Sequence, residues 1–297
     1  VSMQGDTFTS KLTTAGKSGK GVPDLALIAS EALPTYKHQD MLETWDDMID
    51  GTELARENYV EAAWDTGVVD DSQYGIPATM GSWVMYYNQD LVDKYVPGAL
   101  DDGVVTYEEI RQAGEKAKAD GIYSFGYTWG MQNYSNLYQQ MGGEWQDAQG
   151  NSNIDNEYSH NAVQEFKDLY DAGYMVPDGE DANKLFANQQ LIFLPEGTWM
   201  LSNMEEISDF TWGQTFTPQW DAEHIIQGSG VDQFAMFKTN EERSDEKKSG
   251  MVDFLTWLQA NQLEWVKSGA NPTSLAMLDN EEYVEMPQSF LLKTEKG

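Results

Sequence analysis

Three tryptophans in this sequence lie in turn-like contexts beside apolar runs. Trp199 follows the run LIFL and the turn Pro-Glu-Gly-Thr, Trp129 follows YSFGY, and Trp83 follows a Gly-Ser pair. A tryptophan on a turn presents a large flat apolar surface, which neighbouring residues do not automatically cover. Either the core covers such a ring, which is the default interpretation of any tryptophan, or a ligand does.

Polar side chains occupy the loops at the ends of the predicted strands. These loops are Ser30-Glu31 after DLALIA, 80–83 before VMYYN, 128–130 after YSFGY, 196–199 after LIFL, and 228–233 before FAMF. They offer aromatic rings, amides, hydroxyls and carboxylates with very little positive charge. That chemistry suits a neutral sugar, because rings take its C–H face and polar groups its hydroxyl edge. For Glu31 alone, a plain surface carboxylate is the default interpretation.

One aromatic ring cannot hold a sugar by itself. Covering about a third of a Trp face contributes on the order of 1 to 2 kcal/mol, whereas micromolar binding requires about 8 kcal/mol. We therefore expect two or three aromatic platforms with several hydrogen bonds of roughly 1 kcal/mol each. Trp212, Trp257 and Trp265 lie in strand or helix patterns and are expected in the core.

The charge balance excludes several classes of partner. The chain has 18 Lys and Arg against 50 Asp and Glu, a net charge of −32 and a pI near 4.1. Such a chain repels phosphate backbones and anionic lipid, so nucleic acid is not expected as a partner. The simplest interpretation is a solubilising surface, which would also suit a salt-loving organism. The alternative is attraction of a cation or polyamine.

Cysteine is absent, and the three histidines, His38, His160 and His224, are far apart in sequence. The absence of cysteine excludes a disulfide framework, a thiolate nucleophile and a Cys-ligated metal. No two histidines have the spacing of paired metal ligands, so neither a zinc site nor a histidine-based triad is predicted. We expect no cofactor and no metal.

Helical and extended patterns alternate along the chain, which predicts an α/β fold with sites at the carboxyl ends of strands. A helical pattern around 8–15 precedes an apolar strand at 24–29, and a Gly-Ser break precedes a strand at 83–87. Further strands are predicted at IYSFGY, LIFL, FTWGQTF and the end of QGSGVDQFAMF. Because 24–29 is continuously apolar, we expect it to be buried on both faces of a parallel or mixed sheet.

Capping residues mark the predicted helices. Thr106 and Glu109 form a capping box for a helix that reaches to about residue 119, and a short helix is expected near 181–188. Ser159 and Ser244 are predicted to cap two further helices. On these two helices we expect shared apolar faces of Val163, Phe166 and Tyr170, and of Met251, Phe254, Leu255 and Leu258.

The chain begins VSMQGDTF and ends LLKTEKG, with neither an initiating Met nor a signal peptide at its start. We interpret it as a piece of a longer mature protein from which any targeting segment has been removed. No stretch approaches the roughly 18 to 20 apolar residues of a membrane helix. At 297 residues, the chain is long enough for two lobes and hence for a cleft.

Four stretches, taken in order, resemble one known family. They are KLTTAGKSGKGVPDLALI, YGIPATMGSWVMYYNQDL, LFANQQLIFLPEGTWML and VDFLTWLQANQLEWVKSGANPTS. They look like the extracellular solute-binding proteins of ABC transporters, specifically the carbohydrate branch that includes maltose-binding proteins. The resemblance covers nearly the whole chain, although no single motif is decisive.

The resemblance implies a two-lobe, periplasmic-binding-protein-like α/β fold, with mixed sheets flanked by helices and a hinge between the lobes. It places 1–83 in the first lobe, 84–227 in the second lobe, 228–283 in the first lobe again, and 284–297 at the start of a return to the second. It also implies that part of each terminus of the family fold is absent from this chain.

The resemblance further implies which residues contact a ligand. Glu31, with Ser30 beside it, falls where the family often places an acid that bonds sugar hydroxyls, and Trp199 matches the stacking Trp of a G-x-W pattern. The other implied positions are Gly81, Ser82 and Trp83 at the first crossing, Trp129, Gln132, Asn133, Tyr134 and Glu196 in the second lobe, Ser229, Asp232 and Gln233 near the second crossing, and Asn271 in a Pro-containing loop.

One departure concerns the ligand. At the first crossing, the maltose-type pattern offers an acid where this chain has Gly81 and Ser82. This difference puts a maltose ligand in doubt, and the many Gln and Asn residues between 132 and 140 would suit another oligosaccharide.

The resulting expectation is a non-catalytic receptor. It would bind an oligosaccharide in a cleft between two lobes and deliver it to the transmembrane subunits of an ABC permease. We expect a monomer that is extracellular, either as a membrane-anchored lipoprotein of a Gram-positive bacterium or in a periplasm. Two alternatives stay open: a glycoside hydrolase, which also uses aromatic subsites and paired carboxylates, and a receptor for a polyamine or cationic peptide.

Overall fold

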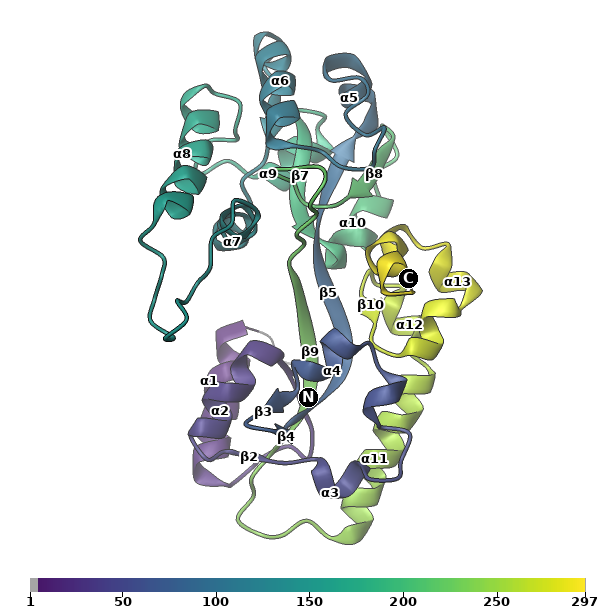
Figure 1. The fold of residues 1–297 in the computed structure, drawn as a ribbon. Coiled ribbons are helices and arrows are strands. Elements are labelled where there is room, and N and C mark those ends of the chain that lie inside the picture. Colours follow the sequence, from purple (N-terminus) through teal and green to yellow (C-terminus); the bar gives the residue numbers. More distant parts are fainter. Residues whose placement is uncertain (1–4, 297) are drawn as a thin grey trace. The chain divides into compact units, whose positions relative to one another are not determined.

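The computed structural model describes residues 5–296 and divides into two compact units (Figure 1). Unit 1 combines Val1–Gly81 with Gly230–Gly297, and unit 2 is Ser82–Ser229. The chain passes between the units at 81/82 and 229/230, close to the predicted boundaries at 83/84 and 227/228.

The sheet of unit 1 is built around strand β9 (Ser229–Phe237). Strands β1 (Ala26–Ala29) and β2 (Leu42–Glu43) pair with it antiparallel, and β10 (Asn271–Pro272) pairs antiparallel with the first half of β5 (Gly75–Asn88). The helices and short elements of unit 1 are α1 (Gly5–Ser18), η1 (Ser30–Ala32), α2 (Leu33–His38), α3 (Asp46–Ile49), η2 (Arg56–Asn58), α4 (Glu61–Asp65), β3 (Val68–Val69), β4 (Ser72–Gln73), α11 (Asp245–Ala260), α12 (Leu263–Val266), η5 (Leu275–Asp279), α13 (Glu281–Val284) and η6 (Pro287–Lys296).

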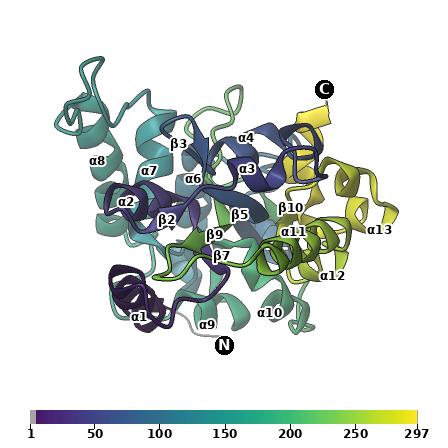
Figure 2. The same ribbon diagram turned by 90° about the horizontal axis from the view of Figure 1, so that it is seen from below.

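The last three residues of β9 are all buried, and because successive side chains point to opposite sides of a strand, they pack on both of its faces. Ala235 and Phe237 pack in a cluster with Leu12 of α1 and Tyr36 of α2. Met236, between them, packs in a second cluster that includes residues of α4 and α11. Helices α1 and α2 accordingly lie on one side of β9 and α11 on the other (Figures 1 and 2). The neighbouring apolar strand β1 was expected to be buried on both faces, but only Ala26 and Ile28 are buried, whereas Leu27 and Ala29 are partly exposed.

The sheet of unit 2 combines antiparallel and parallel pairing. The second half of β5 is antiparallel to β7 (Leu191–Gly197) and to β8 (Trp212–Thr215), whereas β6 (Tyr123–Phe125) is parallel to β7. The mixed α/β sheet predicted from the alternating pattern is therefore confirmed. The helices of unit 2 are α5 (Gln89–Tyr95), α6 (Tyr107–Ala117), η3 (Lys118–Asp120), α7 (Gly130–Gln140), α8 (Glu157–Asp171), α9 (Ala182–Ala187), η4 (Thr198–Met200) and α10 (Leu201–Glu205).

Two predicted caps are confirmed and one is wrong. The capping box of Thr106 and Glu109 begins α6, and Ser244 caps α11. Helix α8 begins three residues earlier than a cap at Ser159 would allow, because Asn156 accepts the backbone N–H of Ser159 and is the N-cap. Both residue types cap helices well, so the choice between them depends on where the preceding turn ends.

Two predicted apolar features of the helices are wrong. On α8, Val163 and Tyr170 are exposed, and the buried face instead contains Ala162, Phe166 and Leu169. On α11, Met251 and Leu255 are buried as predicted, whereas Phe254 and Trp257 are exposed. Trp257 is therefore not a core residue. Residues at the border of the apolar stripe of a helix can lie on its buried or on its exposed face, and the 3.6-residue period alone does not distinguish the two.

The predicted Gly-Ser break at 81–82 is absent, because β5 continues from Gly75 to Asn88 without interruption (Figure 1). The expected return of 284–297 to the second lobe also does not occur within the part of the chain that the structure describes. Gln288 donates to Val266 O at 2.8 Å, and Leu292 packs with Val60 and Met80, all in unit 1.

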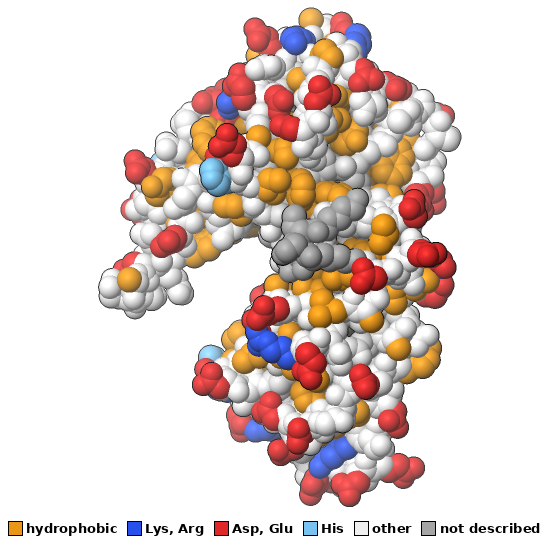
Figure 3. All heavy atoms as spheres, turned by 45° about the vertical axis from the view of Figure 1, so that its right-hand side comes forward, with side chains coloured by type: hydrophobic (Ala, Val, Ile, Leu, Met, Phe, Trp, Pro, Cys, Tyr) orange, Lys and Arg blue, Asp and Glu red, His pale blue; other side chains and the backbone are white. Residues whose placement is uncertain are grey.

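Acidic side chains are spread across the face drawn in Figure 3, and Lys and Arg are few. Many of these cations pair with carboxylates at the surface, as Lys94 does with Asp120 at 2.9 Å. Exposed pairs of this kind contribute little stability. Among residues 5–296, no helix combines the length and apolar character needed to cross a bilayer.

Candidate functional site

Three tryptophan rings form a corner on unit 2. The rings of Trp83 and Trp199 have centroids 4.8 Å apart, those of Trp83 and Trp129 are 4.9 Å apart, and those of Trp129 and Trp199 are 5.8 Å apart. The interplanar angles of 83°, 63° and 78° are those of edge-to-face contacts. Trp129 is 53% exposed and Trp199 42% exposed, and Trp83 is half-buried. We call these three residues the tryptophan corner.

The strand register brings the corner together. Trp83 lies directly opposite Gly197 across the β5–β7 pair, and Trp199 follows Gly197 by two residues. Strand β6 runs parallel to β7, so the loop that leaves β6 and carries Trp129 emerges at the same sheet edge as the end of β7. Residues 46 and 70 positions apart in sequence thus become neighbours, because the ends of β6 and β7 lie beside the part of β5 that contains Trp83.

Gly197 has a specific role beneath Trp199. A Cβ built on Gly197 would lie closer than 3.0 Å to Cε2, Cζ2 and Cη2 of the Trp199 ring. No real side chain tolerates such a distance, so the indole can lie against the backbone only because residue 197 is glycine. This contact supplies the physical reason for the Gly-x-Trp spacing in the sequence.

A buried carboxylate orients Trp129. The Trp129 Nε1–H donates to Glu196 Oε2 at 2.8 Å, and Glu196 is only 5% exposed. The same oxygen accepts the N–H of Gly197 at 3.2 Å. Trp129 has φ 47° and ψ 56°, a left-handed conformation that costs a non-glycine residue about 1–3 kcal/mol. The hydrogen bond to Glu196 and one from Thr128 Oγ1 to Pro195 O help to hold this strained turn.

The amides expected near Trp129 mostly support the loop. Asn133 is buried and donates to Thr128 O and, at 3.4 Å, to Trp129 O. The Tyr134 hydroxyl lies 2.8 Å from Ser159 Oγ. Gln132 is half-buried on the same first turn of α7. Asn133 and Tyr134 therefore form hydrogen bonds within unit 2. A ligand that bonds to either side chain would have to share or replace these hydrogen bonds.

Two carboxyl groups predicted as ligand contacts interact within unit 1. Glu31 is exposed in η1, directly after β1, and Asp232 lies on β9 opposite Ala29. Burial raises the pKa of the Asp232 carboxyl, and the nearby negative charge of Glu31 raises it further. Ser30 is half-buried between Ala29 and Glu31.

Three of the remaining predicted residues, Gln233, Asn271 and Ser82, are buried. Gln233 is fully buried and donates to Thr66 Oγ1 at 2.8 Å and to Ala63 O at 3.2 Å. Asn271 is also fully buried, and its Oδ1 accepts the Tyr283 hydroxyl at 2.9 Å. Ser82 is buried in β5, Gly81 precedes it, and Ser229 is exposed at the start of β9.

Sequence reasoning missed two residues that support the corner. The Gln227 amide donates to the backbone oxygen of Trp83, and the Asn183 amide lies 3.4 Å from Glu196 Oε1. Asn183 lies on helix α9 and Gln227 in the loop before β9. No local pattern marks either residue, because both contacts depend on how distant segments pack.

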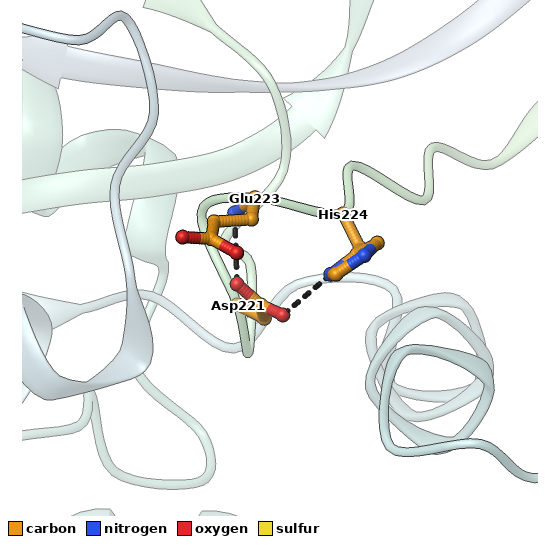
Figure 4. Close-up of side chains that lie close together, drawn as sticks. All are labelled: Asp221, Glu223 and His224. Atoms are coloured by element: carbon orange, nitrogen blue, oxygen red, sulfur yellow. Dashed lines mark hydrogen bonds and ion pairs between the residues drawn. The ribbon is translucent and has the colours of Figure 1, made fainter.

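One group of possible metal ligands occurs among residues 5–296, in the loop between β8 and β9. Asp221, Glu223 and His224 offer ligand atoms within 4.8 Å of one another (Figure 4). His224 Nδ1 lies 2.7 Å from Asp221 Oδ2, and the Glu223 N–H donates to Asp221 Oδ1 at 2.8 Å. Hydrogen bonding and the charge of Asp221 raise the pKa of His224, which favours an ion pair over the neutral imidazole that a metal requires.

Comparisons with known proteins identify the type of chain. A family model described as bacterial extracellular solute-binding protein matches residues 1–290. An arabinooligosaccharide-binding protein of Halalkalibacterium halodurans is 24% identical over 298 aligned residues, which cover 94% of this chain. The alignment spans 65% of that relative's length.

Solved structures show the same fold. An ABC substrate-binding protein of Listeria monocytogenes in complex with cycloalternan superposes with a TM-score of 0.78 at 18% identity, over 96% of this chain and 73% of that one. UgpB of Mycobacterium tuberculosis, in complex with glycerophosphocholine, gives a TM-score of 0.80 at 17% identity, over 96% and 74%. At these identities the likeness establishes the two-lobe fold and leaves the ligand open.

Proposed function

Since the chain belongs to the family of bacterial extracellular solute-binding proteins, we propose that it is a receptor that binds an oligosaccharide at the tryptophan corner. The observation that carries this proposal is the exposure of Trp129 and Trp199, at 53% and 42%, on a rigid and hydrogen-bonded support. A free surface has no need for two large exposed apolar rings, one of them held in a strained turn. A ligand with C–H faces would cover them.

The chemistry of the corner supports a neutral ligand over an anion. Glu196, the charged group of the corner, lies behind Trp129. None of the residues predicted to contact the ligand is Lys or Arg. A phosphate would meet only negative charge there, whereas sugar hydroxyls can donate to carboxylates. The glycerophosphocholine complex therefore offers a poorer guide to the ligand than the oligosaccharide-binding relatives.

The energetics require more than one ring. Covering part of two exposed indoles contributes on the order of 2–4 kcal/mol, and micromolar affinity requires about 8 kcal/mol. The remainder must come from several hydrogen bonds and a third platform such as Trp83. An oligosaccharide fits this requirement better than a monosaccharide because it presents more than one ring face.

We further propose the biological setting that this family membership suggests. The bound sugar would be handed to the transmembrane subunits of an ABC permease outside the cell, by a monomeric protein that a lipid anchors to the membrane. Ligand binding would shift a hinge equilibrium between the two units. Small-angle scattering with and without sugar measures that shift directly, and an unchanged radius of gyration would argue against it.

A thermal-shift screen tests the binding function. Arabino- and malto-oligosaccharides should raise the melting temperature of the chain in proportion to the logarithm of their concentration above Kd. Trp199→Ala should remove the shift of the best sugar, whereas Trp257→Ala, at an exposed tryptophan of α11 in unit 1, should leave it unchanged. If no neutral oligosaccharide shifts the wild-type protein, the proposal is wrong.

A glycoside hydrolase is the second candidate, because Glu31 and the pKa-raised Asp232 form a pair of interacting carboxyl groups. Prolonged incubation with the same sugars distinguishes the two functions. If the wild type raises its melting temperature with the sugar and leaves the sugar intact, the receptor is supported. If the wild type shortens the sugar and Asp232→Asn does not, the enzyme is supported. A polyamine receptor would instead lose its ligand as salt is raised, which a neutral sugar would not.

A further inference from the structure

The loop between β8 and β9, residues 216–228, exposes large apolar side chains although unit 2 is strongly acidic. Trp220 and Ile225 are each 44% exposed, and Ile226 is 37% exposed. Isolated exposed apolar residues are common, but here three occur within seven residues, on a loop that approaches the tryptophan corner.

Two glutamines fix this loop. Gln140, the last residue of α7, accepts the N–H of Trp220 at 2.9 Å and donates to Pro218 O at 3.0 Å and Ile226 O at 3.2 Å. Gln219 is fully buried and bonds the backbone of Ile226 through both ends of its amide. The backbone on both sides of Trp220 is therefore pinned, so the exposure of its indole is a property of the folded loop.

The tip of the loop is also ordered by its own contacts. Asp221 accepts the N–H of Glu223 and pairs with His224, as Figure 4 shows. These bonds close a tight turn immediately after Trp220, because the Asp221 carboxylate contacts both Glu223 N–H and the His224 ring. Trp220 and Ile225 flank the turn.

The loop connects Trp220 with the tryptophan corner. At its far end, a Cβ on Gly228 would lie 3.3 Å from Cδ1 of Trp83 and 3.2 Å from Nε2 of Gln132. Gln132 and Gln140 lie eight residues apart on α7, which is about 12 Å along a helix axis. Gln140, which holds the backbone of Trp220, therefore lies about two helical turns beyond the residue of α7 that adjoins the corner.

We propose that Trp220 is a second, distal aromatic platform that contacts the far end of an extended oligosaccharide. This inference rests on the proposed function and adds a length requirement to it. A short sugar would cover only the corner, whereas a longer ligand that follows the loop would also reach the indole of Trp220. The amides of Gln132 and Gln227 adjoin this part of the loop and suit hydroxyls, and Ile226 exposes an apolar surface on it.

A ladder of oligosaccharides from disaccharide to heptasaccharide, taken from the best-binding series, tests the inference by calorimetry. We expect Trp220→Ala to bind the shortest bound sugar as the wild type does and the longest sugar about tenfold more weakly. Trp220→Phe should restore most of the affinity for the long sugar. Trp257→Ala, at an exposed tryptophan of similar size in unit 1, is the matched control and should match the wild type throughout.

The outcomes separate this inference from the function on which it rests. If wild type and Trp220→Ala bind every length equally, the distal platform is refuted and the receptor function stands. If Trp220→Ala weakens all lengths equally, Trp220 belongs to the corner itself and the length argument is wrong. If the wild type binds no member of the ladder, both the function and the platform fail. The melting temperature of Trp220→Ala, with an already exposed ring removed, should stay close to that of the wild type.

Discussion

Replacing Gly197 with alanine tests whether the indole of Trp199 lies where the structure places it. A Cβ at this position would lie closer than 3.0 Å to three ring carbons of Trp199. Carbon atoms pack at about 3.5–4.0 Å, so the ring must shift by about 1 Å. The backbone at Gly197, with φ −101° and ψ 159°, is extended and accepts alanine without strain. Displacement of the ring is therefore the main expected effect.

Two opposing effects set the change in stability. Overpacking costs about 1–3 kcal/mol, and the loss of glycine's freedom in the unfolded chain contributes about 0.4–1 kcal/mol in the other direction. Because Trp199 is 42% exposed, its ring can move toward solvent, which keeps the overpacking cost at the low end. We expect the free energy of unfolding of Gly197→Ala to lie within about 1 kcal/mol of the wild type.

Binding should suffer more than stability. The displaced ring no longer meets Trp83 at the 4.8 Å centroid distance, and it no longer forms a wall of the corner. The lost sugar-stacking surface corresponds to about 1–2 kcal/mol, or roughly a 5- to 30-fold increase in Kd for the best oligosaccharide. Isothermal titration calorimetry measures Kd, and thermal melting measures stability in the same samples.

Gly250→Ala is the matched control for this experiment. A Cβ on Gly250, in helix α11, would meet nothing within 4 Å, so this change should leave binding intact. If Gly197→Ala binds within about twofold of the wild type while melting normally, the ring does not occupy the position over residue 197. That result would refute the geometric argument for the Gly-x-Trp spacing.

Three further predictions concern other parts of the chain. Glu196→Gln removes the charge that accepts the Trp129 N–H, so it should lower the free energy of unfolding by about 1 kcal/mol and weaken sugar binding; an unchanged Kd by calorimetry would contradict this. The pKa of Asp232 is raised in the folded state, so the folded carboxyl binds its proton more tightly than the unfolded one, and its contribution to stability should grow as the pH falls through the raised value toward 3.8. Melting curves over that range should show a smaller rise for Asp232→Asn than for the wild type, with Glu31→Gln intermediate, and parallel curves would be evidence against the shift. Thr106→Ala removes the N-cap of α6 and should cost about 1 kcal/mol in urea unfolding, which Thr106→Ser should largely restore; no loss would mean that the capping box is not formed in solution.

Local signals account for the features that the sequence predicted correctly. The caps at Thr106 and Ser244 depend on residues within one helical turn, so a single sequence contains all the necessary information. The exposure of Trp129 and Trp199 also follows from local context, because each ring comes after a strand has ended.

Contacts between distant segments account for the features that it did not predict. The Gly81-Ser82 pair reads as a break, yet pairing with β7 and β10 on either side keeps β5 extended through it. The bond between Trp129 and Glu196 joins a loop to a strand residue 67 positions away, and only the β6–β7 pairing makes it possible. Trp257 lies on a helix with an apolar pattern, but the helix packs on β9 through Met251 and Leu255, which leaves Trp257 exposed. The local pattern does not show which face of the helix makes that contact.

The tryptophan corner is held in place before any ligand arrives, and this has a consequence for affinity. Edge-to-face ring contacts contribute only about 0.5–1.5 kcal/mol each, which is comparable with the entropy lost when one exposed side chain is immobilised on binding. If the rings were held by such contacts alone, the entropy cost of ordering them on binding would offset much of the free energy gained by stacking on the sugar. The buried Glu196 carboxylate fixes Trp129, and the bare backbone of Gly197 seats Trp199, so that ordering is completed during folding. Substitutions at Glu196 and Gly197 should therefore weaken binding even though neither side chain supplies the stacking surface that covers the sugar.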